Sequence, residues 1–293
     1  MKSLCIIGAG RVGKTLGRLF ARAGAFQVVE VRSNRLENAQ AAVAFIGAGE
    51  PTSAASPLRQ ADVFMLTVPD DRIATVAACL RQADVVKPDT ILFHCSGALS
   101  SRDMPLLGTG LVASVHPAKS FVNVEAAVQT FPGCWCACEG TPSALEVLQP
   151  AFEAIGAQTF AIEAEKKMLY HIGCVFGCNY LTALLDVARG CLENAGVPAG
   201  QSLQILQPLI EETVHNNVAL GSTRALTGPI ARGDAGLVER EVLRLEAECP
   251  EWAAAYRLLG KLSADIAGQG ESVSPDALQL IRQSLELADP SDV

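Results

Sequence analysis

Charged residues are scarce in this chain, and positively charged ones are the scarcer of the two signs. Residues of both signs together make up 18% of its 293 residues, and the formal net charge at pH 7 is −8. No basic run interrupts this balance, which argues against nucleic acid as a partner. An uninterrupted apolar stretch of about 18 residues or more is also missing, so we expect no membrane span. The first residues themselves predict a strand, which leaves no room for a signal peptide. We therefore expect a soluble, cytoplasmic protein.

Hydrophobic residues make up 49% of the chain, enough for a large core or a buried subunit interface. The length favours about two domains. Among the ten cysteines, the Cys-x-x-Cys pairs that are typical of metal sites are absent. Cys134, Cys136 and Cys138 alternate, so they would share one face of a strand. We expect them to be buried as small hydrophobic residues, with no metal site and no disulfides.

A glycine-rich turn directly follows the apolar run 4–7, and a helical pattern follows the turn. The turn consists of Gly8, Ala9, Gly10, Arg11, Val12 and Gly13. In such a turn the first glycine allows a tight bend, the second lets the backbone approach a pyrophosphate, and the third lets helix and strand pack closely. The helix N-terminus offers unpaired N–H groups to the phosphates. The order of strand, turn and helix predicts a dinucleotide-binding site.

The end of the second predicted strand indicates which dinucleotide binds. An NAD site usually has an acidic residue there, which binds the ribose 2′-hydroxyl. Here Glu30 lies too early on the strand, and Ser33, Asn34 and Arg35 follow Arg32. A hydroxyl flanked by two guanidinium groups suits a 2′-phosphate, although both arginines could also be ordinary surface residues. We predict NADP (NADPH) in preference to NAD, bound in part by residues 33–35.

Strands alternate with helices as far as residue 164, which predicts a doubly wound, mostly parallel sheet. Ligands bind to such sheets beyond the carboxyl ends of the strands. One strand ends at Val68, Pro69 and Asp70, which we assign to the cofactor site. Two later strands end near Ser96 and at His116, and both residues could contact a substrate from the cofactor side.

After residue 164 the patterns are almost exclusively helical. We therefore predict an α/β chain with an NADP-binding Rossmann domain over 1–164 and an all-α domain over 165–293. Residues 168–192 form one long apolar helical pattern. At about 100° per residue, His171, Asn179, Thr182 and Asp186 share one quadrant of this helix. Buried polar groups need partners, so this stripe contacts either a substrate or other polar groups in a helix bundle or dimer interface.

A second polar group of residues occurs at 226–234. Thr227 and Asp234 are predicted to cap a turn and the helix that follows it. Capping does not account for Arg232, which could bind a substrate carboxylate through a bidentate hydrogen-bonded pair.

Together these motifs resemble the 6-phosphogluconate-dehydrogenase-like superfamily, in which a Rossmann domain precedes a helical domain. Within it the chain is most similar to the Rossmann-like family with a C-terminal domain of unknown function, DUF2520. The matching segments are the glycine turn, 68–71, 94–97, 114–117, 179–181 and 226–234. Relatives include pyrroline-5-carboxylate reductases, 3-hydroxyacid dehydrogenases and ketopantoate reductases. The resemblance implies hydride transfer and a homodimer built through the helical domain.

Ketopantoate reductases carry a catalytic lysine before an Asn-x-Leu-Thr-Ala segment. Here 179–183 match that segment, His171 occupies the register of the lysine, and Lys167 lies one turn earlier. The resemblance thus implies His171 or Lys167 as the proton donor, with Asn179 orienting the substrate and Thr182 and Asp186 beside it. We predict an NADP-dependent reductase of a small carboxylate-bearing carbonyl or imine, for example a ketopantoate-like 2-oxo acid. The alternative is a nucleotide-binding regulatory or scaffold protein without turnover.

Overall fold

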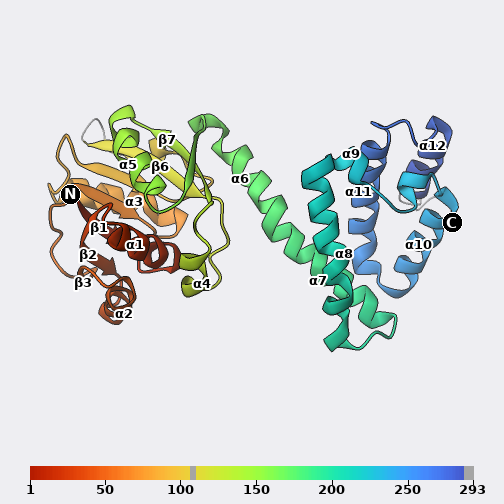
Figure 1. Cartoon of the computed structure of the whole chain (residues 1–293), viewed down its shortest axis with the longest axis horizontal. Coiled ribbons are helices and arrows are strands. Elements are labelled where there is room, and N and C mark those ends of the chain that lie inside the picture. The colour runs from red at the N-terminus through yellow and green to blue at the C-terminus, as the bar shows by residue number, and fades with distance from the viewer. Residues whose placement is uncertain (106–109, 287–293) are drawn as a thin grey trace. The chain divides into compact units, whose positions relative to one another are not determined.

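The computed structural model describes residues 1–105 and 110–286 and divides the chain into two compact units, which meet in the sequence between Leu181 and Thr182 (Figure 1). Strands occur only up to Ala161 in the described ranges, and helices follow from there. The Rossmann-like sheet followed by a helical region confirms the predicted fold class. The predicted domain boundary at residue 164 stays a prediction.

The first unit contains an eight-stranded sheet in the order β3-β2-β1-β4-β5-β6-β7-β8. All neighbouring strands are parallel except β6 and β7, which are antiparallel. The strands are β1 (Ser3–Ile7), β2 (Gln27–Ser33), β3 (Glu50–Ser53), β4 (Val63–Leu66), β5 (Ile91–His94), β6 (Leu111–Pro117), β7 (Trp135–Gly140) and β8 (Gln158–Ala161). The helices are α1 (Arg11–Ala23), α2 (Leu36–Ile46), α3 (Asp70–Gln82), the 3₁₀ turn η1 (Ser101–Asp103), α4 (Val124–Gln129), α5 (Pro142–Glu153), the 3₁₀ turn η2 (Ala164–Lys166) and α6 (Lys167–Val175).

Helices cover both faces of this sheet because its central strands are apolar on both sides. On β1, Leu4 and Ile6 pack into one core cluster together with Phe20 of α1. The alternate residues Cys5 and Ile7 pack into a second cluster with side chains of α3. This alternation is the period of two that an extended strand imposes. The carboxyl ends of β1, β4, β5 and β6 therefore lie side by side at one edge, where the connecting loops gather.

The two cysteines of β7 and the cysteine directly before it pack into the core of this unit. Cys134, Cys136 and Cys138 are 9%, 0% and 1% exposed, and all three have free thiols. Their predicted burial as small hydrophobic residues is confirmed.

The second unit is helical throughout its described residues. It contains α7 (Leu181–Asn194), which begins one residue before the unit, α8 (Ala199–Leu220), α9 (Ser222–Ala225), the 3₁₀ turn η4 (Ile230–Arg232), α10 (Ala235–Glu248), α11 (Pro250–Ala267) and α12 (Pro275–Ser284). Its core includes Val238 and Val242 of α10, Ala264 of α11 and Ile281 of α12. The predicted cap of α10 is confirmed, since the Asp234 side chain accepts a hydrogen bond of 3.0 Å from the backbone N–H of Leu237.

The long apolar helix predicted over 168–192 is present, but it is not a regular α-helix. A π-turn, η3 (Phe176–Tyr180), stands between α6 and α7. Because a π-turn holds more residues than an α-helical turn, a constant step of 100° does not carry across it. The angles of residues 179, 182 and 186 relative to residue 171 therefore differ from those expected at 100° per residue, and their shared quadrant stays a prediction. By length and composition alone, the helix over residues 164–194 contains an 18-residue window apolar enough to cross a membrane. None of that window is buried in the protein, and one such helix is weak evidence for a membrane span.

Candidate functional site

The glycine turn after β1 leaves an open space in front of the N-terminus of α1. Gly8 has a φ of +115°, and a Cβ there would lie 2.4 Å from the Thr67 carbonyl oxygen. A Cβ on Gly13 would lie 2.2 Å from the Gly8 carbonyl oxygen, so close packing of strand and helix requires both glycines. A Cβ on Gly10 would meet only the Thr67 oxygen, at 4.0 Å. Gly10 therefore preserves the space that a phosphate needs at the helix N-terminus.

A cavity of about 460 Å³ extends along this turn at the carboxyl ends of β1, β2 and β4. Residues 8–10 of the turn line it, and so do four further residues that the sequence predicts for the cofactor: Ser33, Asn34, Val68 and Pro69. Arg32 also belongs to the lining. The predicted Arg11, Val12, Gly13, Arg35 and Asp70 are not part of the lining. A helix N-terminus beside hydroxyl and amide side chains in one cavity fits the phosphate and ribose groups of a dinucleotide.

The guanidinium group of Arg32 is fully engaged inside the protein. Its Nε donates to Glu30 Oε1 at 3.1 Å, and Nη1 donates to the carbonyl oxygens of Ser53 and Ser56 at 2.7 and 2.9 Å. Nη2 donates to the Pro57 oxygen at 2.7 Å and pairs with Glu30 at 3.0 Å. All five N–H groups of the guanidinium thus have acceptors. The interpretation in which Arg32 binds a 2′-phosphate is therefore corrected.

Arg35 is the arginine that remains at this corner. It is exposed and is the N-cap residue of α2, directly after Ser33 and Asn34. Glu30, which an NAD site could have used, is 2% exposed and also accepts a hydrogen bond of 2.5 Å from Thr52. The corner therefore presents no carboxylate from β2 to a ribose hydroxyl.

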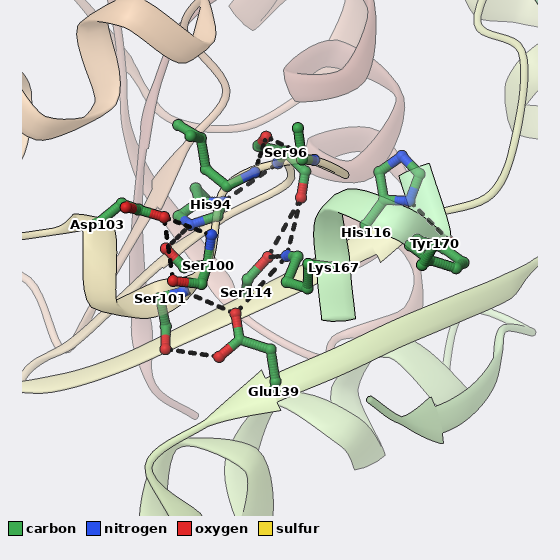
Figure 2. A network of polar contacts seen from close by, with 12 residues as sticks. His94, Ser96, Ser100, Ser101, Asp103, Ser114, His116, Glu139, Lys167 and Tyr170 are labelled. Atoms are coloured by element: carbon green, nitrogen blue, oxygen red, sulfur yellow. Dashed lines mark hydrogen bonds and ion pairs between the residues drawn. The ribbon is translucent and has the colours of Figure 1, made fainter. Parts of the chain in front are cut away.

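A buried polar network joins the carboxyl ends of β5 and β6 to the start of α6 (Figure 2). Lys167 lies at its centre and has no exposed surface. Its Nζ donates to the Ser96 carbonyl oxygen at 3.0 Å and to Ser114 Oγ, and lies 3.7 Å from Glu139 Oε1. Glu139 also accepts hydrogen bonds of 2.7 Å from the backbone N–H and the hydroxyl of Ser101. Each N–H of the ammonium group therefore has a partner.

Burial and the ion pair act in opposite directions on Lys167. Burial is the largest influence and lowers the pKa of its ammonium group, whereas the Glu139 carboxylate raises it. The sequence offers Lys167 as an alternative proton donor, and that role stays a prediction. The geometry favours a structural role, because the ammonium group is enclosed by protein and anchors α6 to the edge of the sheet.

Ser96 takes part in the same region through its loop. Its hydroxyl donates to Asp70 Oδ2 at 2.7 Å and accepts from the backbone N–H groups of Ala98 and Leu99 at 3.2 and 3.0 Å. Its backbone N–H donates to His94 Nδ1 at 3.2 Å, and burial lowers the pKa of His94. These bonds tie the loop after β5 to the first residue of α3. Contact of Ser96 with a substrate stays a prediction.

A second cavity, of about 380 Å³, lies at the carboxyl end of β6. Three residues predicted for the substrate site line it, namely His116, His171 and Asn179. His116 lies near the end of β6, His171 lies in α6, and Asn179 lies in the π-turn. The rings of the two histidines meet edge to face with their centroids 6.0 Å apart. Residues that are far apart in the sequence thus gather around one cavity.

Gly97 sets how closely these histidines approach the loop after β5. A Cβ on Gly97 would lie 2.6 Å from His171 Nδ1 and 2.8 Å from His116 Nε2. His171 Nδ1 is enclosed and has no hydrogen-bond partner among the described residues. Buried polar atoms are usually hydrogen-bonded, so an imidazole nitrogen in this state is more typical of a functional site than of a packed core.

His116 has a polar partner on α6. The hydroxyl of Tyr170 lies 2.9 Å from His116 Nδ1, as Figure 2 shows. Burial, together with the nearby Lys167 and His171, lowers the pKa of His116 to about 4. His116 is therefore neutral at pH 7. Burial also raises the pKa of Tyr170, which stays protonated.

Three residues of this region were missed by sequence reasoning. Tyr170 directly precedes His171, and Lys119 follows His116 by three residues, so both positions carried a usable signal next to a predicted residue. Glu139 gave no such signal, because it lies on β7 and meets Lys167 only through the antiparallel pairing with β6.

The remaining predicted residues lie in the second unit, and none of them lines either cavity described above. Asp186 is exposed and pairs with Arg189 of its own helix at 2.6 Å. Thr182 is the first residue of the unit. Arg232 is exposed and ends η4. Their contact with a substrate stays a prediction.

Comparison with protein families places both parts of the chain. Residues 1–117 match the model of a Rossmann-like domain, and residues 134–263 match a domain of unknown function, DUF2520. The chain is a Rossmann-like protein with a DUF2520 domain. No curated protein matches this Rossmann-like/DUF2520 protein.

Solved structures share the fold of the Rossmann-like/DUF2520 protein over most of its length. Protein TM1727 from Thermotoga maritima is 26% identical, with a TM-score of 0.71 over 91% of this chain and 98% of its own. A candidate NADP oxidoreductase, BF3122 from Bacteroides fragilis, is 21% identical, with a TM-score of 0.70 over the same shares. The NADP-bound pyrroline carboxylate reductase of Plasmodium falciparum is 12% identical, with a TM-score of 0.57 over 97% of this chain and 98% of its own. The latter two likenesses are likenesses of fold.

Proposed function

We propose that this protein is an NADP-dependent oxidoreductase that transfers a hydride to a small carbonyl or imine compound bearing a carboxylate. A ketopantoate-like 2-oxo acid is one candidate substrate. One observation carries the proposal: a cavity walled by His116, His171 and Asn179 lies at the same edge of the sheet as the cavity beside the glycine turn. The strands that lead to the two cavities, β4 and β6, are separated only by β5.

Each part of the cofactor would have its own place in the first cavity. The backbone N–H groups after Gly10 bind the pyrophosphate, while Ser33, Asn34 and Arg35 bind the 2′-phosphate of the adenosine ribose. The loop of Val68 and Pro69 closes the side of the cavity toward β5. The cofactor supplies the hydride, and the protein supplies position and a proton. Solved structures of similar fold include NADP-bound reductases, which supports this choice.

The residues of the second cavity would act on the substrate. His171 donates a proton to the substrate oxygen or nitrogen as the hydride arrives, and Asn179 orients that atom by hydrogen bonding. His116, neutral at pH 7, offers a further hydrogen bond from a ring whose position Tyr170 fixes. Thr182, Asp186 and Arg232 of the second unit stay sequence-based candidates for substrate binding, and the sequence offers Arg232 as a partner for a carboxylate.

Oxidation of NADPH against a panel of 2-oxo acids, 3-oxo acids and cyclic imines tests the proposal. For a compound that is turned over, His171→Gln should lower kcat by about 100-fold, the usual scale for a lost general acid, and leave the Kd for NADPH unchanged. If turnover survives and the melting temperature falls instead, His171 is structural. Binding of NADPH without turnover of any panel compound would favour the alternative of a regulatory or scaffold protein.

We further propose that the protein works as a homodimer in the cytoplasm, with the helical unit as the contact surface. Apolar side chains of this unit are exposed: Leu209 and Val218 of α8 by 62% and 85% of their surface, and Leu258 of α11 by 61%. Large exposed apolar surfaces usually mark protein contacts. Sedimentation at micromolar concentration tests this, and a monomer would contradict it.

A further inference from the structure

We propose that Lys119 binds the carboxylate of the substrate and thereby makes the protein select acids over neutral carbonyl compounds. This inference rests on the proposed function, because it assigns the binding partner within the same site. Lys119 lines the cavity that His116, His171 and Asn179 also line. It follows His116 by three residues, just beyond the end of β6.

The position of the ammonium group is fixed by the end of a helix. Lys119 Nζ donates to the Thr130 carbonyl oxygen at 2.9 Å and to Thr130 Oγ1 at 2.8 Å. Thr130 is the C-cap residue of α4, and its hydroxyl donates in turn to the Ala126 carbonyl oxygen at 2.8 Å. An ammonium group has three N–H donors, so two of them hold Lys119 in place and one remains. A cation held in this way can receive an anion without losing much side-chain entropy.

The charges around the cavity favour an anion. Its lining contains no aspartate or glutamate, and its histidine His116 is neutral at pH 7 because burial lowers its pKa to about 4. Lys87, Lys166 and Lys167 each lie within ion-pair distance of a carboxylate, at 3.0, 3.1 and 3.7 Å. Within the described ranges no such carboxylate partner is found for Lys119. Its positive charge is therefore uncompensated at the wall of a cavity that also holds general acid–base groups.

The size of the effect follows from the kind of bond. A hydrogen bond to a charged group contributes enough to change a dissociation constant by about tenfold or more, and the partly exposed position of Lys119 favours the lower end. A carboxylate held at Lys119 would also orient the neighbouring carbonyl group toward His171 and Asn179. Lys119 is in this sense a specificity-determining residue, and it acts from the same unit as the two histidines.

Two measurements on the NADPH-loaded full chain test the inference. The first is calorimetric titration with oxamate, a stable analogue of a 2-oxo acid. Lys119→Met should raise its Kd by about tenfold, Lys119→Arg should largely restore it, and Lys87→Met, which removes the same charge elsewhere, should leave it unchanged. The second is the ratio of kcat/KM for a 2-oxo acid to that for its amide, which should fall by about tenfold in Lys119→Met with little change for the amide.

The outcomes separate this inference from the proposed function. Oxamate binding that depends on Lys119, with no turnover of any compound, would refute the reductase and support the carboxylate site. Absence of oxamate binding to the wild-type protein, or equal Kd values for wild type and Lys119→Met, would overturn the inference. So would a lower melting temperature in Lys119→Met with an unchanged Kd, since that result would show that Lys119 only caps α4.

Discussion

Gly97→Ala should disable the histidine site while it leaves the fold and the cofactor site intact. The new Cβ would lie 2.6 Å from His171 Nδ1 and 2.8 Å from His116 Nε2. Since nonbonded heavy atoms sit about 3.5 Å apart, the two rings must retreat by about 0.9 and 0.7 Å. A displacement of about 1 Å at reacting groups costs on the order of 100-fold in rate. We therefore expect kcat to fall about 100-fold, with the Kd for NADPH within about twofold of wild type.

The same substitution can be followed without a substrate. The chain has four histidines, so their imidazole signals can be assigned by single variants in nitrogen-15 NMR spectra. The signals of His116 and His171 should shift in Gly97→Ala, and that of the exposed His215 should not. The matched control is Gly173→Ala on α6, where a Cβ meets nothing within 4 Å. We expect this control to keep its activity and to gain up to about 1 kcal/mol of stability from the better helix former.

Overpacking alone costs about 1–3 kcal/mol, so the melting temperature of Gly97→Ala must be measured beside its activity. Wild-type turnover in a folded Gly97→Ala protein would refute the assignment of both histidines to the reaction. Unshifted imidazole signals would refute the packing on which the assignment depends.

Three further predictions concern the cofactor, the buried network and pH. Arg35→Ala should weaken NADPH binding by about tenfold through loss of a charge-assisted hydrogen bond and leave NADH binding unchanged, and fluorescence titration that shows equal losses would contradict this. Lys167→Met should lower the free energy of unfolding by about 3–5 kcal/mol, because Glu139 is then buried without its counter-charge. Urea unfolding of Lys167→Met, and of a double variant in which Glu139 is also replaced, checks this prediction. His116 has a pKa of about 4 in the folded chain and about 6.5 when unfolded, so the unfolded state takes up the proton first as the pH falls. Stability should therefore decrease between about pH 6.5 and 4, by at most about 1.4 kcal/mol per pH unit from this residue, and His116→Gln should show a shallower decrease.

Local patterns in the sequence were sufficient for much of the fold. The glycine turn, the alternation of strands and helices and the cap at Asp234 each depend on residues within a few positions of one another, and each is present in the structure. The gathering of His116, His171 and Asn179 around one cavity also agrees with such patterns, because a strand end carries the first residue and one helical segment carries the other two.

Other features depend on contacts that no local pattern carries. The use of all five N–H groups of Arg32 requires the loop after β3, more than twenty residues further on, so the sequence alone favoured Arg32 as a phosphate ligand. The pairing of Lys167 with Glu139 requires the reversal of chain direction between β6 and β7. The π-turn at 176–180 has no recognisable signature in composition, and it changes the angles on which the predicted polar stripe depends.

The engagement of Arg32 has a consequence for redesign of coenzyme preference. An arginine at the end of the second strand is an obvious target for anyone who wishes to exchange NADP for NAD. Here its replacement would release three backbone carbonyl groups, of Ser53, Ser56 and Pro57, together with the carboxylate of Glu30. A library built at that position would sample collapsed loops more than altered coenzyme choice. Mutagenesis confined to residues 33–35 would explore coenzyme choice on an intact scaffold.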